Sequence, residues 1–136
     1  MVDTWAKSDC INGNTYDLGQ AKQRMTRHAD FRGRYRFVQN TTNAAVELFG
    51  DSQLDWIYLD ATHTYAEARN DLERWYPKVR RGGLISGHDY QFQSQAMGDG
   101  YTFGVKDAVD EFAAQRGIRV YQTTERYLPS FYFLKC

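Results

Sequence analysis

The sequence predicts an α/β fold with a mostly parallel sheet that ends in a C-terminal antiparallel hairpin. Short apolar, β-rich runs alternate with segments of helical periodicity in units of roughly thirty residues, which is typical of strand–helix–strand crossovers in a parallel sheet. The last two runs, 119–123 and 131–134, are separated by a short connection that contains Pro129. This short connection favours antiparallel pairing, which makes the sheet mixed.

The first part of the chain predicts a helix, a strand and a second helix. Residues 15–30 are polar with scattered apolar positions and are interpreted as helix, and residues 34–39 alternate and are β-rich, which predicts a short strand. The second helix is expected to begin with Thr42 as its N-cap, to run through Phe49 and to end at Gly50.

The middle of the chain contains a buried strand followed by a capped helix. Residues 54–59, Leu-Asp-Trp-Ile-Tyr-Leu, are a nearly continuous apolar run, which predicts a strand covered on both faces. Thr64 and Glu67 fit a capping box, and the helix that follows places apolar side chains from Tyr65 to Tyr76 along one face.

The third part of the chain predicts a turn, a strand and a helix. Pro77 and the pair Gly82-Gly83 are expected to end the preceding helix and to turn the chain, and 84–87 is expected to be the next strand. Residues 90–103 form the longest irregular stretch, and helical spacing resumes over 105–112.

Composition indicates one globular domain over 1–136, in a chain of 136 residues. Lysine plus arginine (17) equals aspartate plus glutamate (17), so nucleic acid is not the expected partner. The basic stretch between Lys22 and Arg36 is interpreted as a solvated face, with a site for an acidic substrate or nucleic acid as the alternative. Cys10 and Cys136 make no disulfide framework. Neither a membrane-spanning run nor a secretory signal is visible, so the expected location is cytoplasmic.

Four polar residues follow predicted strands, where α/β sheets bind their ligands. Asp60 ends one strand, and His88 and Asp89 end the next. Converging carboxylates repel each other unless a cation lies between them, and a hard divalent cation meets that need. His63, three residues after Asp60, is placed to take a proton from a substrate hydroxyl. The alternative interpretations are a helix cap for Asp60, a solvated loop position for His63, and turn positions for His88 and Asp89.

Five segments then occur in order along the chain and together resemble a known family. They are Leu54-Asp-Trp-Ile-Tyr-Leu-Asp-Ala-Thr-His-Thr-Tyr, Asp71-Leu72, Pro77, Gly82-Gly-Leu-Ile-Ser-Gly-His-Asp-Tyr and Gly104-Val-Lys-Asp-Ala-Val-Asp-Glu-Phe. This series resembles class I S-adenosylmethionine-dependent methyltransferases, and more narrowly methyltransferase family 24, which is related to macrolide and aminocoumarin sugar O-methyltransferases. The resemblance implies a Rossmann-like sheet and S-adenosylmethionine as the cofactor.

The resemblance also implies catalytic and metal-binding roles. Asp60 matches a metal-binding aspartate, and His88 and Asp89 fall where the family completes a magnesium site. The imidazole of His88 would shift the preference toward a transition metal. His63 matches a proposed general base, with Asp60 as the alternative base. The substrate would be a small molecule or sugar with a free hydroxyl, activated by the metal and aligned with the sulfonium methyl.

For the cofactor, the resemblance assigns Asp3 to the ribose hydroxyls and Thr41 and Thr42 to the adenine contact region, with Asp60 at the same site. The family's first strand and its glycine-rich turn would precede Asp3, so the domain is expected to be N-terminally truncated. Without that strand, the sheet would close up, recruit a strand from another chain or leave two edges that invite association. A homo-oligomer is one expectation that follows. Two other functions stay open: an incomplete module that assembles with itself or a partner, and a metal-dependent hydrolase that uses Asp60, His63, His88 and Asp89.

Overall fold

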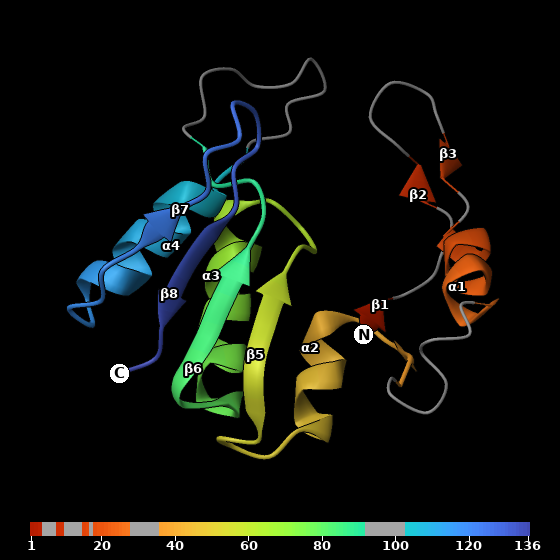
Figure 1. Ribbon diagram of the computed structural model, residues 1–136, viewed down its shortest axis with the longest axis horizontal. Helices are drawn as coiled ribbons and strands as arrows, with labels where there is room; N and C mark the ends of the chain where they lie inside the picture. Colours follow the sequence, from red (N-terminus) through yellow and green to blue (C-terminus); the bar gives the residue numbers. More distant parts are fainter. Residues whose placement is uncertain (4–7, 10–14, 17, 28–35, 92–102) are drawn as a thin grey trace. The chain divides into compact units, whose positions relative to one another are not determined.

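The computed structural model describes residues 1–3, 8–9, 15–16, 18–27, 36–91 and 103–136 (Figure 1). The chain divides into two compact units, Met1–Ala45 and Val46–Cys136, and each is described by itself. One domain over 1–136 therefore stays a prediction. Most of the predicted loop 90–103 lies outside the described residues. Within the described part of the chain, no helix combines the length and the apolar character needed to cross a bilayer.

The described residues of the first unit form short strands and two helices. Strand β1 runs parallel to β4. Strands β2 and β3 form an antiparallel pair that was not predicted from the sequence. The helix predicted over 15–30 is present as α1, but Thr15 and Tyr16 form the strand β3 instead, and the last two residues of the strand predicted over 34–39 form β4. The elements are β1 (Val2–Asp3), β2 (Ser8–Asp9), β3 (Thr15–Tyr16), α1 (Leu18–Arg27), β4 (Val38–Gln39) and α2 (Thr42–Ala45).

The helix predicted from Thr42 forms, but its cap is one residue earlier. Ala44 N donates a hydrogen bond to Thr41 Oγ1 at 3.3 Å, so Thr41 satisfies a free N–H at the helix start. After α2 the chain tightens into the 3₁₀ helix η2 (Val46–Leu48). Thr42 is therefore the first helical residue rather than the cap.

The second unit is a four-stranded mixed sheet with helices on one face (Figure 1). The strand order is β5-β6-β8-β7. The β5–β6 pair is parallel, and β8 is antiparallel to both β6 and β7, which confirms the predicted C-terminal hairpin. The elements are β5 (Leu54–Leu59), α3 (Tyr65–Trp75), η3 (Tyr76–Lys78), β6 (Val79–Gly87), α4 (Val105–Ala114), β7 (Tyr121–Gln122) and β8 (Phe131–Leu134).

The core lies between the sheet and the helices α3 and α4. Ile57, Ile85 and Phe133 stand opposite one another across β5, β6 and β8, and they are at most 9% exposed. Leu72 of α3 and Phe112 of α4 are buried, and the Phe112 ring lies 6.2 Å from that of Phe133. Burial of large apolar side chains on one sheet face is what fixes the helices there.

Two local expectations about the strands are wrong. β6 begins at Val79, five residues before the predicted start at Leu84, and it absorbs Gly82-Gly83 in an irregularity instead of a turn. Gly82 has a φ of +70°. At Gly83 a Cβ would lie 2.8 Å from the backbone oxygen of Asp55, so only glycine lets the two strands approach there.

The strand β5 is also covered on one face instead of two. Ile57 points into the core, whereas Trp56 and Tyr58 are 57% and 45% exposed. In a continuous apolar run, both faces of the strand carry apolar side chains. The sequence therefore does not distinguish a strand with two covered faces from a strand with one exposed aromatic face.

Candidate functional site

The carboxyl ends of β5 and β6 lie side by side and carry the predicted acidic residues. Leu59 pairs with Gly87 at the last register position, and His88 N donates a hydrogen bond to Leu59 O at 3.0 Å. A Cβ at position 87 would lie 2.5 Å from Leu59 O, so this close approach requires glycine. As a result, Asp60 after β5 and Asp89 after β6 face the same place.

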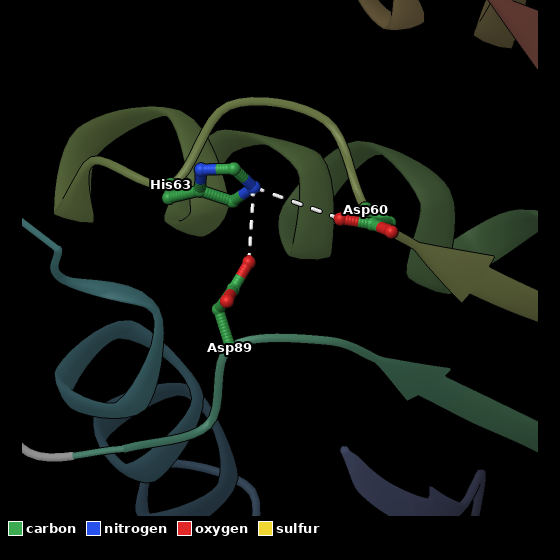
Figure 2. A group of neighbouring side chains, drawn as sticks. All are labelled: Asp60, His63 and Asp89. Atoms are coloured by element: carbon green, nitrogen blue, oxygen red, sulfur yellow. Dashed lines mark ion pairs between the residues drawn. The ribbon is translucent and has the colours of Figure 1, made fainter. Parts of the chain in front are cut away.

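His63 joins the two carboxylates into one cluster (Figure 2). Its Nε2 atom lies 3.0 Å from Oδ2 of Asp89 and 3.6 Å from Oδ1 of Asp60. The Asp89 side chain is 5% exposed and that of Asp60 is 49% exposed, so the imidazole bridges a buried carboxylate and a solvent-facing one. His88 lies beside the cluster, with Nδ1 at 3.5 Å from Oδ2 of Asp89.

The loop that carries His63 is held by the starts of α3 and α4. Thr64 is the N-cap of α3 and accepts a hydrogen bond from Glu67 N at 3.4 Å, which confirms it as the predicted cap. Its hydroxyl donates to the Glu67 carboxylate at 2.8 Å, so the two residues of the predicted capping box also pair through their side chains. Gly104 N donates to His63 O at 2.8 Å. A Cβ at position 104 would lie 2.5 Å from Tyr65 N, so glycine allows α4 to approach this loop closely.

The segment that carries Asp89 is held from the other side. Asp89 has a φ of +59°, a left-handed conformation that Asp tolerates better than most residues. The next residue, Tyr90, is buried; its N–H donates to Pro129 O at 2.9 Å and its hydroxyl donates to Asp110. Lys106 Nζ lies 4.3 Å from the centre of the Tyr90 ring. These contacts hold the strained backbone at Asp89 in one conformation.

The two carboxylates control the charge on His63. Contacts with Asp60 and Asp89 raise the pKa of His63 to about 9, although partial burial opposes the shift. The same contact with His63 lowers the pKa of Asp60. Because Asp89 is buried, solvent screens its contact with His63 less than it screens the contact between His63 and Asp60. At neutral pH the cluster therefore holds an imidazolium between two carboxylates.

The donor set also fits a divalent cation. One ligand atom each from Asp60, His63 and Asp89 lies within 4.8 Å of the others. Two carboxylates with an imidazole suit manganese, iron or zinc, and the carboxylates alone suit magnesium. The resemblance placed His88 in this set, whereas among the described residues it is His63 whose ring nitrogen lies within 4.8 Å of both carboxylates.

Two residues without an assigned role also belong to the site. The Phe103 ring stacks on His63, with ring centres 5.2 Å apart and planes inclined by 13°. Asp71 is 5% exposed and lines a pocket beside the cluster, together with Ala68, Leu72, Val105 and Val109. The sequence signal for Asp71 was an acidic residue at helical spacing between Ala68 and Trp75 on the apolar face of α3.

The predicted cofactor residues Asp3, Thr41 and Thr42 all belong to the first unit. Asp3 is the last residue of β1, and its carbonyl accepts a hydrogen bond from Asn40 N at 3.0 Å. The parallel pairing of β1 with β4 therefore brings the two predicted cofactor-binding segments together at one sheet end. Asp60, the fourth predicted cofactor residue, belongs to the second unit.

A family model described as "Methyltransferase domain" matches residues 1–90. A relative from Sinorhizobium fredii (strain NBRC 101917 / NGR234), the uncharacterized protein y4gI, is 24% identical over 97 residues, which is 71% of this chain and 10% of that protein. The chain therefore spans a tenth of the length of this relative.

Solved structures share the fold. An O-methyltransferase family protein from Burkholderia thailandensis superposes with a TM-score of 0.65 and 15% identity, over 87% of this chain and 41% of that one. An O-methyltransferase from Bacillus cereus in complex with SAH gives a TM-score of 0.60 at 12% identity, over 87% and 58% of the two chains. The O-methyltransferase NovP gives 0.56 at 22% identity, over 98% and 58%. The chain therefore covers about half of these structures.

Proposed function

Because this chain belongs to the methyltransferase domain family, we propose that it transfers a methyl group from S-adenosylmethionine to a hydroxyl group of a small molecule. The observation that carries the proposal is the convergence of Asp60, His63 and Asp89 at the carboxyl ends of two parallel strands. That edge of an α/β sheet is where ligands bind. An imidazole held between two acids can accept the proton of a substrate hydroxyl once it has lost its own proton, and hydroxyl activation needs such a base.

The cofactor would bind at the ends of β1 and β4. The Asp3 carboxylate would accept hydrogen bonds from the ribose hydroxyls, and Thr41 and Thr42 would lie near the adenine. The closeness of Asp3 to the segment after β4 supports this assignment. When bound, S-adenosylmethionine supplies a methyl group on a positively charged sulfur, which a negatively charged oxygen can attack.

His63 would act as the general base. In its neutral form, the imidazole would accept the proton of the substrate hydroxyl, and the oxygen would keep the electron pair with which it attacks the methyl carbon. The electron pair of the broken methyl–sulfur bond would stay on the sulfur of the departing cofactor product. Asp89 and Asp60 then stabilise the imidazolium that results. Because the pKa of His63 is about 9, the neutral base becomes more abundant as the pH rises toward that value. Phe103 keeps the ring in place by stacking on it.

A divalent cation is the second part of the proposal. Asp60 and Asp89, with His88 or His63 as the nitrogen donor, would hold it, and a bound cation would lower the pKa of a substrate hydroxyl. The two carboxylates have the charge and the spacing that such an ion requires.

The experiment measures cofactor binding and methyl transfer by the full chain. Calorimetry with S-adenosylmethionine should give a measurable heat, and radiolabelled cofactor should pass its methyl group to a member of a panel of sugars and phenols. Asp89→Asn and His63→Gln should lower the rate, whereas Asp55→Asn, at an exposed surface ion pair with Arg80, should leave it unchanged. No heat at millimolar cofactor, or an unchanged rate in Asp89→Asn, would contradict the proposal.

A further inference from the structure

The ring nitrogen Nε2 of His63 lies between the two carboxylates of the cluster (Figure 2). It is 3.0 Å from Oδ2 of Asp89 and 3.6 Å from Oδ1 of Asp60. Ligand atoms that bind one metal ion at about 2.1 Å lie about 3.0 Å apart at a right angle and about 3.4 Å apart at the tetrahedral angle. Both nitrogen–oxygen distances are therefore close to those between ligands of a single ion.

The other histidine at the site, His88, is placed less well to share an ion with both acids. Its Nδ1 atom lies 3.5 Å from Oδ2 of Asp89. In the part of the chain that the structure describes, however, the three side chains whose ligand atoms all lie within 4.8 Å of one another are those of Asp60, His63 and Asp89. The observed arrangement therefore offers His63, and not His88, as the nitrogen ligand of an ion between the two carboxylates.

The imidazole and the buried acid are held in this arrangement by their surroundings. The Phe103 ring stacks on the His63 ring at 5.2 Å, and Gly104 N donates to the His63 carbonyl oxygen at 2.8 Å. The Asp89 side chain is 5% exposed, so neighbouring groups restrict its movement. Ligands that are already in place lose little conformational freedom when an ion binds, which favours binding.

A cation at this place would exclude the role of His63 as a base. Two neighbouring carboxylates need a positive charge between them. Without a metal ion the protonated His63 ring supplies that charge, and a bound cation would supply it instead. The Nε2 atom of a neutral imidazole has one lone pair, so it binds either a cation or a proton. The same nitrogen therefore cannot hold the ion and accept the proton of a substrate hydroxyl.

We propose that His63, and not His88, is the nitrogen ligand of a divalent cation that Asp60 and Asp89 share, so that His63 serves as a base only in chains without the cation. A set of two carboxylates and one imidazole suits manganese, iron or zinc, whereas magnesium prefers oxygen ligands. This inference rests on the metal part of the proposed function. It does not rest on methyl transfer, because binding of the metal alone is measured without cofactor or substrate.

Electron paramagnetic resonance of manganese with the full chain tests the proposal. Pulsed spectra of the bound ion should show the nitrogen coupling of a directly bound imidazole. His63→Gln should remove this coupling and weaken the manganese affinity about tenfold or more, whereas His88→Gln should keep both. Asp51→Asn, whose carboxylate pairs with Lys78 at the surface, is the control and should behave as the unaltered chain does.

A second measurement needs no variant and so does not depend on whether a substituted chain folds. Zinc is added to the unaltered chain, and nitrogen nuclear magnetic resonance follows the histidine rings. The signal that moves on coordination should be that of Nε2 of His63, while the ring nitrogens of His88 keep their positions. A roughly hundredfold excess of magnesium should not displace the zinc.

The outcomes that would overturn the proposal are distinct from a failure of methyl transfer. Nitrogen coupling that persists in His63→Gln, or that disappears in His88→Gln, would overturn it. So would a coordination shift at His88, or displacement of zinc by magnesium. A chain that binds neither manganese nor zinc would overturn it as well, while the heat of S-adenosylmethionine binding would still test the proposed methyl transfer separately.

Discussion

His63 Nε2 lies 3.0 Å from the buried carboxylate of Asp89, and this contact joins two loops that follow different strands. Asp89 has a φ of +59°, and the hydrogen bonds of the next residue, Tyr90, fix its position. A hydrogen bond from Gly104 N to the carbonyl oxygen of His63 fixes that residue. The ion pair thus depends on two supports, one on each side. Both supports include α4, which begins directly after Gly104 and carries Lys106 and Asp110.

The first prediction concerns the protonation of His63. Nuclear magnetic resonance titration of the imidazole should give a pKa of about 9 in the unaltered chain. Asp89→Asn should move that pKa down toward the ordinary value of about 6.5, because the neutral amide no longer favours the charged ring. Asp55→Asn, whose carboxylate pairs with Arg80, is the control and should leave the titration in place. A pKa near 6.5 in the unaltered chain would contradict the ion pair.

The second prediction is a pH dependence of stability. The pKa of His63 is raised in the folded chain, so its contribution is complete below the unfolded pKa of about 6.5 and is lost as the pH rises through about 9. Urea unfolding should therefore show that His63→Gln loses more free energy of unfolding at pH 6 than at pH 9.5. Equal losses at the two pH values would mean that the imidazolium adds nothing.

The third prediction tests the support beneath Asp89. Tyr90→Phe keeps the buried ring on Phe131 but removes the hydroxyl that donates to Asp110. We expect a loss of about 1 kcal/mol in the free energy of unfolding, together with a change in the chemical shift of the His63 ring. Tyr127→Phe, at a tyrosine that is 73% exposed, should change neither. Intact His63 signals in Tyr90→Phe would show that Asp89 holds its position without this hydroxyl.

The fourth prediction tests the close approach of α4 to the His63 loop. In Gly104→Ala the new Cβ would lie 2.5 Å from Tyr65 N, so backbone must move. Overpacking of this kind costs about 1–3 kcal/mol of stability, and hydrogen exchange of the Gly104 amide should accelerate. Gly50→Ala is the matched control, because its Cβ would lie 3.7 Å from the flexible Gln53 side chain. Equal stability of the two variants would argue against the tight contact.

The fifth prediction concerns metal binding. Manganese should bind the full chain, and Asp60→Asn or Asp89→Asn should weaken its affinity about tenfold or more. Electron paramagnetic resonance of free manganese measures this directly. Asp51→Asn, at an exposed ion pair with Lys78, serves as the control. If all of the variants bound manganese with the same affinity as the unaltered chain, the ion would be bound by other surface carboxylates and not by Asp60 and Asp89.

The sequence by itself was sufficient for the α/β class, the capped helix after Thr64 and the C-terminal hairpin. These follow from signals that act over a few residues: the capping box at Thr64 and Glu67, the apolar run from Leu54 to Leu59, and the short connection before Phe131. It also placed Asp60 and Asp89 at strand ends, because strand ends are visible as the points where an apolar run stops.

Only the tertiary structure decided which of these residues meet. Asp89, which follows β6, contacts His63, which follows β5. Asp71 of α3 and Phe103, just before α4, also line the site. It also decided that Trp56 and Tyr58 face outward. A pattern of apolar and polar residues specifies what a segment can bury, but what stands opposite it depends on strand order and register, which arise from packing between residues far apart in the chain.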